Sequence, residues 1–188
     1  WCDWSSDVCS SDLLPLRAHL REVKRKMGVV PQEVAVYEEL SARQNLDFWG
    51  GVYGLRGAEL RRRVEAVLEQ VGLAERAKDQ VRTYSGGMKR RLNLAMGLIH
   101  DPRLILLDEP TVGIDPQARH NILDVVRDIV RGGRTVLYTT HYLEEAESLC
   151  DRLAILDRGQ IKAQGTVAEL KAQLGEGSLL TVQGAFTA

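Results

Sequence analysis

Residues 104–110 of this 188-residue chain are Leu-Ile-Leu-Leu-Asp-Glu-Pro, four aliphatic side chains followed by two carboxylates. An aliphatic run of this length is typical of a buried central strand in a parallel sheet. Ligands of open α/β sheets bind at the carboxyl ends of the strands, where Asp108 and Glu109 emerge. One carboxylate at that place can hold a metal ion, and its neighbour can act as a general base. The alternative is an acidic strand end that leads into a turn.

Strands and helices alternate on both sides of this stretch. Upstream, residues 27–30 predict a short buried strand that Pro31 ends. The elements expected downstream are a helix that begins at Asp115-Pro116 and stops at Gly132-Gly133, a strand at 135–140, a helix at about 142–150, a strand at 153–156, a hairpin turn at 157–160, a return strand and a helix capped by Thr166 and Glu169. The inward positions expected for the first of these helices are Ile122, Leu123, Val126, Ile129 and Val130. This alternation predicts an α/β fold with a mostly parallel sheet.

Between residues 33 and 100 the pattern is helical instead. Ser41 and Gln44 have the spacing of a capping box, and a second helix over about 58–71 is followed by Gly72 as its C-cap glycine. A third helix is expected to begin near Gly87 and to end at His100, whose positive charge would favour the helix dipole. We therefore expect an α/β core formed by residues 14–32 and 101–174, an inserted helical subdomain over 33–100, and a segment of uncertain structure over 175–188.

Residues 1–13 have neither helical nor strand periodicity. Part of this stretch, Asp-Trp-Ser-Ser-Asp-Val-Cys-Ser-Ser-Asp-Leu, resembles a translated sequencing-library adapter, and we expect a non-native, disordered tail. A natural disordered tail is the alternative. Outside it only Cys150 remains, so the sequence predicts no disulfide framework, which fits a reducing cytosol.

Composition narrows the possible partners. The formal net charge of −1 gives no broad basic field, so electrostatic capture of nucleic acid is not expected. The longest aliphatic run, residues 104–107, is far shorter than the roughly 20 residues needed to span a bilayer. A role at a membrane would therefore require docking onto a protein that spans it.

Four weaker motifs accompany the acidic strand end. Ser85-Gly86-Gly87-Met88 offers a hydroxyl and unobstructed backbone N–H groups to an anion at a helix start, although most such triplets are turns. Gln32 follows a strand, and His141 follows another at the edge where phosphates would lie; each could also be a plain structural residue. Asp115 could be simply an N-cap.

Taken in order, these motifs resemble the ATP-binding cassette (ABC) ATPases, from about Glu22 to Leu174. The resemblance implies that Asp108 is the Mg²⁺-binding aspartate, Glu109 the catalytic base and His141 the switch histidine. It implies that Gln32 belongs to the glutamine loop, which also contacts the metal, and that Asp115 belongs to the loop that signals between two nucleotide sites. The nucleotide-binding signature motif would be formed by Ser85, Gly86, Gly87 and Met88. The signature usually ends in Gln, and Met88 in its place is similar to bacterial drug- and polyketide-export branches.

The resemblance also implies a P-loop NTPase-like core, with ATP and Mg²⁺ as cofactors. Two such subunits would bind ATP head to tail and drive a membrane permease from the cytoplasmic face. Residues near Gln32 and over 34–40 would face the permease. No nucleic acid partner is expected.

Other functions within the same family stay open. Chromosome-maintenance cassettes have a long coiled coil between glutamine and signature motif, but residues 32–85 show no sustained heptads. Ribosome-associated cassettes have two copies and a basic linker. A non-catalytic subunit that completes a partner's ATP site is the third alternative, and Glu109 and His141 argue against it.

One motif of the family is missing from the sequence. No Gly-x-x-x-x-Gly-Lys-Ser/Thr loop occurs, and none of the six lysines follows a glycine. In family order this phosphate-binding loop and an adenine-stacking aromatic residue lie upstream of Gln32. We therefore expect that the chain is truncated at its amino end.

The 188-residue chain is expected neither to bind ATP tightly nor to hydrolyse it. The missing loop supplies the N–H groups and the lysine that hold phosphates, and the acids Asp108 and Glu109 without a cation repel a triphosphate. Equilibrium dialysis with labelled ATP and Mg²⁺ measures this directly. Micromolar binding by the chain would contradict the expectation.

Overall fold

The computed structural model describes residues 19–173. The expectations for residues 1–13 and 175–188 lie outside this range. The described residues divide into two compact units, with the boundary between residues 145 and 146. None of the helices in the described range has the length and hydropathy of a membrane span.

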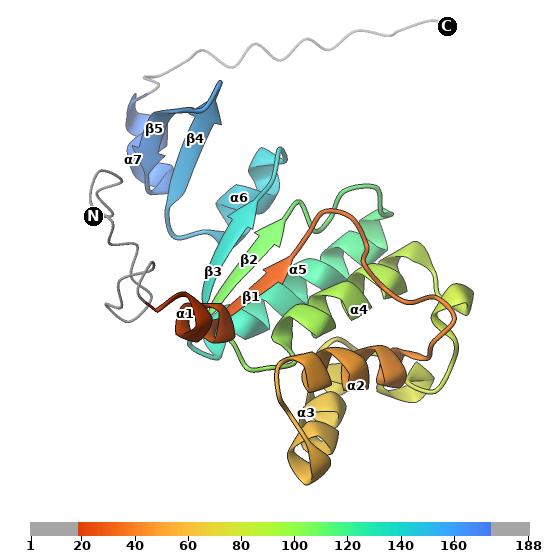
Figure 1. Cartoon of the computed structure of the whole chain (residues 1–188). Helices are drawn as coiled ribbons and strands as arrows, with labels where there is room; N and C mark the ends of the chain where they lie inside the picture. Colours follow the sequence, from red (N-terminus) through yellow and green to blue (C-terminus); the bar gives the residue numbers. More distant parts are fainter. Residues whose placement is uncertain (1–18, 174–188) are drawn as a thin grey trace, which may run out of the picture. The chain divides into compact units, whose positions relative to one another are not determined.

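A three-stranded parallel sheet forms the centre of the first unit (Figure 1). Its strands are β1 (Met27–Val30), β2 (Leu104–Asp108) and β3 (Thr135–Thr139), in that spatial order. The register pairs Val30 with Leu107, and Asp108 with Thr139. Ile105 and Leu107 on β2 are fully buried. The predicted central strand is therefore confirmed.

Helices α4 (Gly86–Leu98) and α5 (Pro116–Arg131) lie on the same side of this sheet (Figure 1). Two glycines allow α4 to approach β1 closely. A Cβ atom at Gly28 would lie 2.3 Å from the Gly97 carbonyl oxygen, and one at Gly97 would lie 2.5 Å from the Val30 side chain. Replacing either glycine by a residue with a side chain would therefore push α4 and β1 apart.

The opposite face of the sheet is open within the described residues. Val29, Leu106 and Leu137 are register partners on the three adjacent strands, so their side chains lie in one row on one face. Val29 is 56% exposed, Leu137 is 59% exposed and Leu106 is half-buried. The row is an apolar stripe on the surface of this unit.

Most of the expected inward positions of α5 are correct: Ile122, Leu123, Val126 and Ile129 are buried. Val130, also expected inside, is 39% exposed. The neighbouring Ile129 is fully buried, and each residue turns the helix by about 100°, which points Val130 outward.

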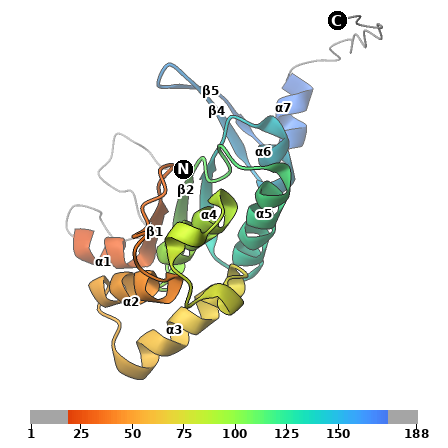
Figure 2. The same ribbon diagram turned by 90° about the vertical axis from the view of Figure 1, so that its right-hand side faces the viewer.

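A short helix, α1 (Leu20–Lys26), precedes β1 and lies outside the helical insert. The insert itself contains the three expected helices. Helices α2 (Ala42–Val52) and α3 (Gly57–Gln70) pack against α4, and the short 3₁₀ turns η1 (Ala74–Arg76) and η2 (Val81–Thr83) lead into it (Figure 2). The predicted capping box is present: the Gln44 N–H donates to Ser41 Oγ at 3.2 Å, and the Ser41 N–H donates to Gln44 Oε1 at 2.9 Å. Gly72 follows α3 with φ +64°, as a C-cap glycine requires.

The second unit confirms the predicted hairpin turn at 157–160 and its return strand, but these strands do not belong to the parallel sheet. Strand β4 (Leu153–Asp157) pairs antiparallel with β5 (Gln160–Gly165) and forms a separate two-stranded sheet, instead of extending the parallel one. The turn between them explains the pairing, since Arg158 and Gly159 both have positive φ, which suits a tight hairpin. The expected cap of α7 (Val167–Gln173) is confirmed, because Thr166 and Glu169 exchange hydrogen bonds of 2.8 and 3.2 Å.

His100 has a plain structural role, as expected, but not through a positive charge at the helix end. Its Nε2 lies 2.9 Å from the Met27 carbonyl oxygen, and its ring stacks on Tyr53 at 3.7 Å. Burial lowers the pKa of the imidazole, so the neutral ring is favoured. The charge at the end of α4 comes instead from Arg63, whose guanidinium donates to the carbonyls of Leu98 and Ile99 at 2.9 and 3.1 Å.

This burial predicts a pH-dependent stability. The pKa of His100 is lowered in the folded state, so the unfolded chain takes up a proton first as the pH falls through about 6.5. The free energy of unfolding should therefore be fully present above that pH and decrease below it. His100→Gln should reduce the slope of unfolding free energy against pH between about pH 7.5 and 5.5, measured by urea titration.

His120→Gln is the matched control, because the side chain of His120 is 65% exposed. It should keep the slope of the wild type. Equal slopes for His100→Gln and the wild type would contradict the assignment.

Candidate functional site

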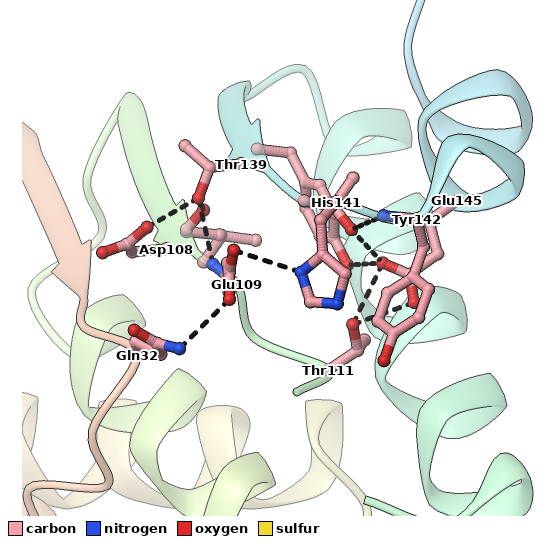
Figure 3. A network of polar contacts seen from close by, with 11 residues as sticks. Gln32, Asp108, Glu109, Thr111, Thr139, His141, Tyr142 and Glu145 are labelled. Atoms are coloured by element: carbon pink, nitrogen blue, oxygen red, sulfur yellow. Dashed lines mark hydrogen bonds and ion pairs between the residues drawn. The ribbon is translucent and has the colours of Figure 1, made fainter. Parts of the chain in front are cut away.

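The candidate site lies where the parallel strands end (Figure 3). Asp108 is the last residue of β2 and stands opposite Thr139, the last residue of β3. Gln32 follows β1, and His141 follows β3 by two residues. Because all three strands run in the same direction, these side chains emerge at one edge of the sheet.

Glu109 is at the centre of the group. Its Oε2 accepts a hydrogen bond of 3.0 Å from Gln32 Nε2, and its Oε1 lies 3.2 Å from His141 Nδ1 (Figure 3). Sequence reasoning expected these three residues to act together, and the structure brings them into contact. An ionised carboxylate can only accept, so the proton of this imidazole contact is on Nδ1. His141 Nε2 is then left for another ligand.

The backbone of Glu109 is unusual. Its φ is +42°, in the left-handed region that residues other than glycine rarely adopt. Its N–H donates to Thr139, with the hydroxyl oxygen at 3.0 Å and the carbonyl oxygen at 3.2 Å. Residues in such conformations often cluster at functional sites, where the surrounding structure holds them in place.

Thr139 is a site residue that sequence reasoning missed. Its hydroxyl accepts from the Glu109 N–H and donates to Asp108 Oδ1 at 2.6 Å, so one side chain orients both acids. The sequence feature that could have indicated Thr139 is its position at the end of a predicted strand. That position is informative only when the pairing of β3 with β2 is known. A threonine at the end of a strand is otherwise common.

The group can offer a proton acceptor and part of a metal site. Glu109 is 29% exposed at its side chain and His141 is 55% exposed, so both can be reached by a substrate. Residues 19–173 contain no cluster of three acidic, histidine or cysteine side chains that could hold a metal alone. Mg²⁺ usually combines one or two carboxylates with phosphate and water oxygens, and Asp108 fits that arrangement.

The Ser85–Met88 segment occupies a different place, at the start of α4. Ser85 is the N-cap, and its Oγ accepts from the Met88 N–H at 3.3 Å. A Cβ atom at Gly87 would lie 2.5 Å from the Ala118 side chain, so this glycine allows α4 to pack against α5. No neighbour stands within 4 Å of a Cβ atom built at Gly86, which leaves that side of the helix start open.

Asp115 caps the adjacent helix. Its Oδ1 accepts from the Ala118 N–H at 2.8 Å, and Pro116 takes the first helical position. The plain structural role considered for Asp115 is therefore present.

A further contact joins these parts. The guanidinium of Arg90 on α4 donates to the carbonyl oxygen of Gln32 and, at 3.0 Å, to that of Val112. Sequence reasoning gave Arg90 no role. The contact connects α4 to the segment that follows β1.

The parallel sheet with acids at its carboxyl edge defines an α/β protein, and comparison with known proteins agrees. A model of the ABC transporter family matches residues 7–112, a range that begins within residues 1–13. The chain belongs to the ABC transporter family. The predicted family and fold class are confirmed.

Three curated relatives are similar over most of the chain. The linearmycin resistance ATP-binding protein of Bacillus subtilis is 52% identical over 87% of this chain and 53% of its own length. The daunorubicin resistance ATP-binding protein of Streptomyces coeruleorubidus is 47% identical over 81% of this chain and 48% of its own length. The Nod factor export ATP-binding protein I of Ralstonia nicotianae is 43% identical over 81% of this chain and 47% of its own length. The chain thus spans about half the length of these relatives.

Solved structures agree as well. An ATP-binding subunit of an ABC transporter superposes with a TM-score of 0.72 at 31% identity, covering 86% of this chain and 68% of that one. The cbiO1 protein of Clostridium perfringens, part of the ABC transporter complex cbiONQ, superposes with a TM-score of 0.77 at 25% identity. The match covers 87% of this chain and 67% of cbiO1.

The capping contact of Asp115 predicts a stability effect. Asp115→Ala should lower the free energy of unfolding by about 1 kcal/mol, because the Ala118 N–H loses its acceptor. Asp115→Ser, which keeps a capping oxygen, should stay within a few tenths of a kcal/mol of the wild type. Urea unfolding followed by circular dichroism measures both. An unchanged stability of the alanine variant would exclude the cap.

Proposed function

We propose that the chain is part of the ATPase subunit of an ABC exporter, and that it supplies the acids used for hydrolysis by the intact subunit. The observation that supports this most directly is the contact of Glu109 with Gln32 and His141 at the carboxyl edge of the sheet. A carboxylate held by two side-chain partners on separate segments is well placed to act on a water molecule. The family membership supplies the reaction class, phosphoryl transfer from ATP to water.

In this proposal Glu109 is the general base. It takes a proton from the attacking water while Gln32 and the Nδ1–H of His141 fix the orientation of its two oxygens. His141 Nε2 faces the terminal phosphate. Bound Mg²⁺ would be held by Asp108, with the Gln32 amide oxygen as a further ligand, and would neutralise phosphate charge. Thr139 keeps Asp108 and Glu109 in their relative orientation.

The start of α4 has a separate task. In one chain it lies beside the start of α5. We propose that Ser85, Gly86, Gly87 and Met88 bind the nucleotide held by a second ATPase subunit, and that Asp115 lies at the same junction. The open side of Gly86 and the backbone N–H groups of a helix start suit an anion. Two subunits would then face head to tail.

The permease would dock on the helical insert. Tyr37 is 46% exposed, Phe48 is 47% exposed and Val52 is 61% exposed, and the rings of Tyr37 and Phe48 meet edge to face at 5.2 Å. Exposed apolar side chains that gather in this way often mark a protein interface. Such docking would hold the subunit at the inner face of the membrane. The names of the relatives, which refer to resistance and export, favour export over import.

Glu109→Gln is the central test, in a version of the protein extended upstream by a phosphate-binding segment. The amide keeps the shape of the side chain but cannot accept a proton, so ATP should still bind while turnover falls by about 10²–10⁴-fold. Fluorescent-nucleotide binding and phosphate release measure the two properties.

Glu144→Gln provides the matched control, because Glu144 is an exposed acid three residues beyond His141. It should leave both properties unchanged. Near-normal hydrolysis by Glu109→Gln would remove Glu109 from the proposed role.

A further inference from the structure

A second carboxylate lies behind the site, and the mechanism above does not use it. Glu145 is only 4% exposed and is on α6 (Leu143–Leu149). A buried carboxylate is costly unless hydrogen bonds and a counter-charge compensate it. Figure 3 shows Glu145 on the side of the site where Thr111, His141 and Tyr142 lie.

Three hydroxyl groups donate to this carboxylate. Thr111 Oγ1 lies 2.9 and 3.0 Å from its two oxygens, and Tyr138 Oη and Thr140 Oγ1 each lie 2.9 Å from Oε2. Thr111 belongs to the loop after β2, Tyr138 to β3 and Thr140 to the loop after β3. One buried group therefore fixes two loops and a strand together.

The two loops are those that position the proposed catalytic pair. Thr111 follows Glu109 by two residues, and Thr140 directly precedes His141. The Thr140 hydroxyl also accepts from the Tyr142 N–H at 3.0 Å, so the backbone is held on both sides of His141. The contact between His141 and Glu109 is thus anchored at both ends through Glu145.

A cation and a ring complete the arrangement. Arg119 of α5 forms an ion pair with Glu145, with 3.6 Å between Nε and Oε1. The same guanidinium stands over the Tyr142 ring at 4.4 Å from its centroid, and that ring lies 4.1 Å from the ring of His141. The His141 imidazole is therefore held by its contact with the Tyr142 ring as well as by the hydrogen bonds of the adjacent backbone.

We propose that Glu145 is a positioning residue, which acts through Thr111 and Thr140 to hold the Nδ1 of His141 against Glu109. The inference rests on the proposed function for its effect on turnover, but its geometric part concerns this chain alone. If Glu145 served stability only, its loss would affect unfolding and leave the imidazole contact as it is.

The tautomer of His141 is the readout that separates these two roles. In the wild type the ring should show a protonated Nδ1, fixed by the contact with Glu109. A released ring exchanges between both tautomers, and its nitrogen chemical shifts move toward averaged values. Long-range ¹H–¹⁵N spectra of the 188-residue chain, labelled at histidine and recorded at one pH, report this.

Three variants make the test specific. Thr140→Val removes the hydroxyl that joins Glu145 to the Tyr142 N–H, whereas Thr140→Ser keeps it. Glu145→Gln keeps the shape but replaces one acceptor oxygen by a donor that faces hydroxyl groups. We expect averaged His141 shifts in Thr140→Val and Glu145→Gln, and wild-type shifts in Thr140→Ser. His100, bonded to the Met27 carbonyl elsewhere, should keep its signals and so report that each variant is folded.

Turnover gives the second measurement, in the upstream-extended protein. Loss of positioning should lower kcat by about tenfold to a hundredfold while KM for ATP stays the same, and Thr140→Ser should restore kcat. Wild-type His141 shifts in folded Thr140→Val and Glu145→Gln would overturn the proposal, as would a kcat equal to that of the wild type in both. If Glu109→Gln hydrolyses ATP normally, the proposed function fails, while the tautomer result still decides the role of Glu145.

Discussion

The parallel pairing of β2 with β3 is the constraint on which the site depends. Its register sets Asp108 opposite Thr139, and the chain leaves both strands at the same edge. Every later contact follows from that placement. Glu109 takes up its left-handed backbone beside Thr139, and His141 reaches Glu109 from the neighbouring loop. A shift of the register by one residue would turn Asp108 and Thr139 to opposite faces and break the contacts by which Thr139 orients both acids.

The two glutamates of this region show how environment separates the tasks of one side-chain type. Glu109 is accessible and has one partner for each carboxylate oxygen, which leaves lone pairs for a water molecule. Glu145 is buried and surrounded by hydroxyl donors and Arg119, which occupy its lone pairs. The first arrangement allows chemistry, and the second holds loops in place. The Thr140 hydroxyl joins the Glu145 carboxylate to the backbone N–H of Tyr142, whereas Thr139 accepts from the backbone N–H of Glu109.

Local sequence signals predicted the local structure well. The aliphatic run before Asp108, the capping pairs Ser41–Gln44 and Thr166–Glu169, and Gly72 after α3 all depend on residues close in sequence. Gln32, Glu109 and His141 were found as candidates because strand ends at one edge of a parallel sheet are predictable places.

The misses required knowledge of tertiary contacts. Thr139 and Glu145 look ordinary until the strand register brings their partners to them. His100 was expected to be charged because a helix end favours a cation, but burial against Tyr53 was not visible in the sequence. The hairpin turn at 157–160 was predicted, but the alternation of strands and helices did not show that the strand at 153–156 belongs to a separate two-stranded sheet.

The apolar stripe of Val29, Leu106 and Leu137 has a consequence for the handling of this chain in solution. The stripe is open within the described residues, and the formal net charge of the whole chain is only −1. Apolar surface attracts a second copy, and a charge near zero provides little colloidal repulsion against it. The apparent molecular mass from light scattering should therefore increase with protein concentration. A pH well above the sequence pI of about 6.5 should keep the chain dispersed.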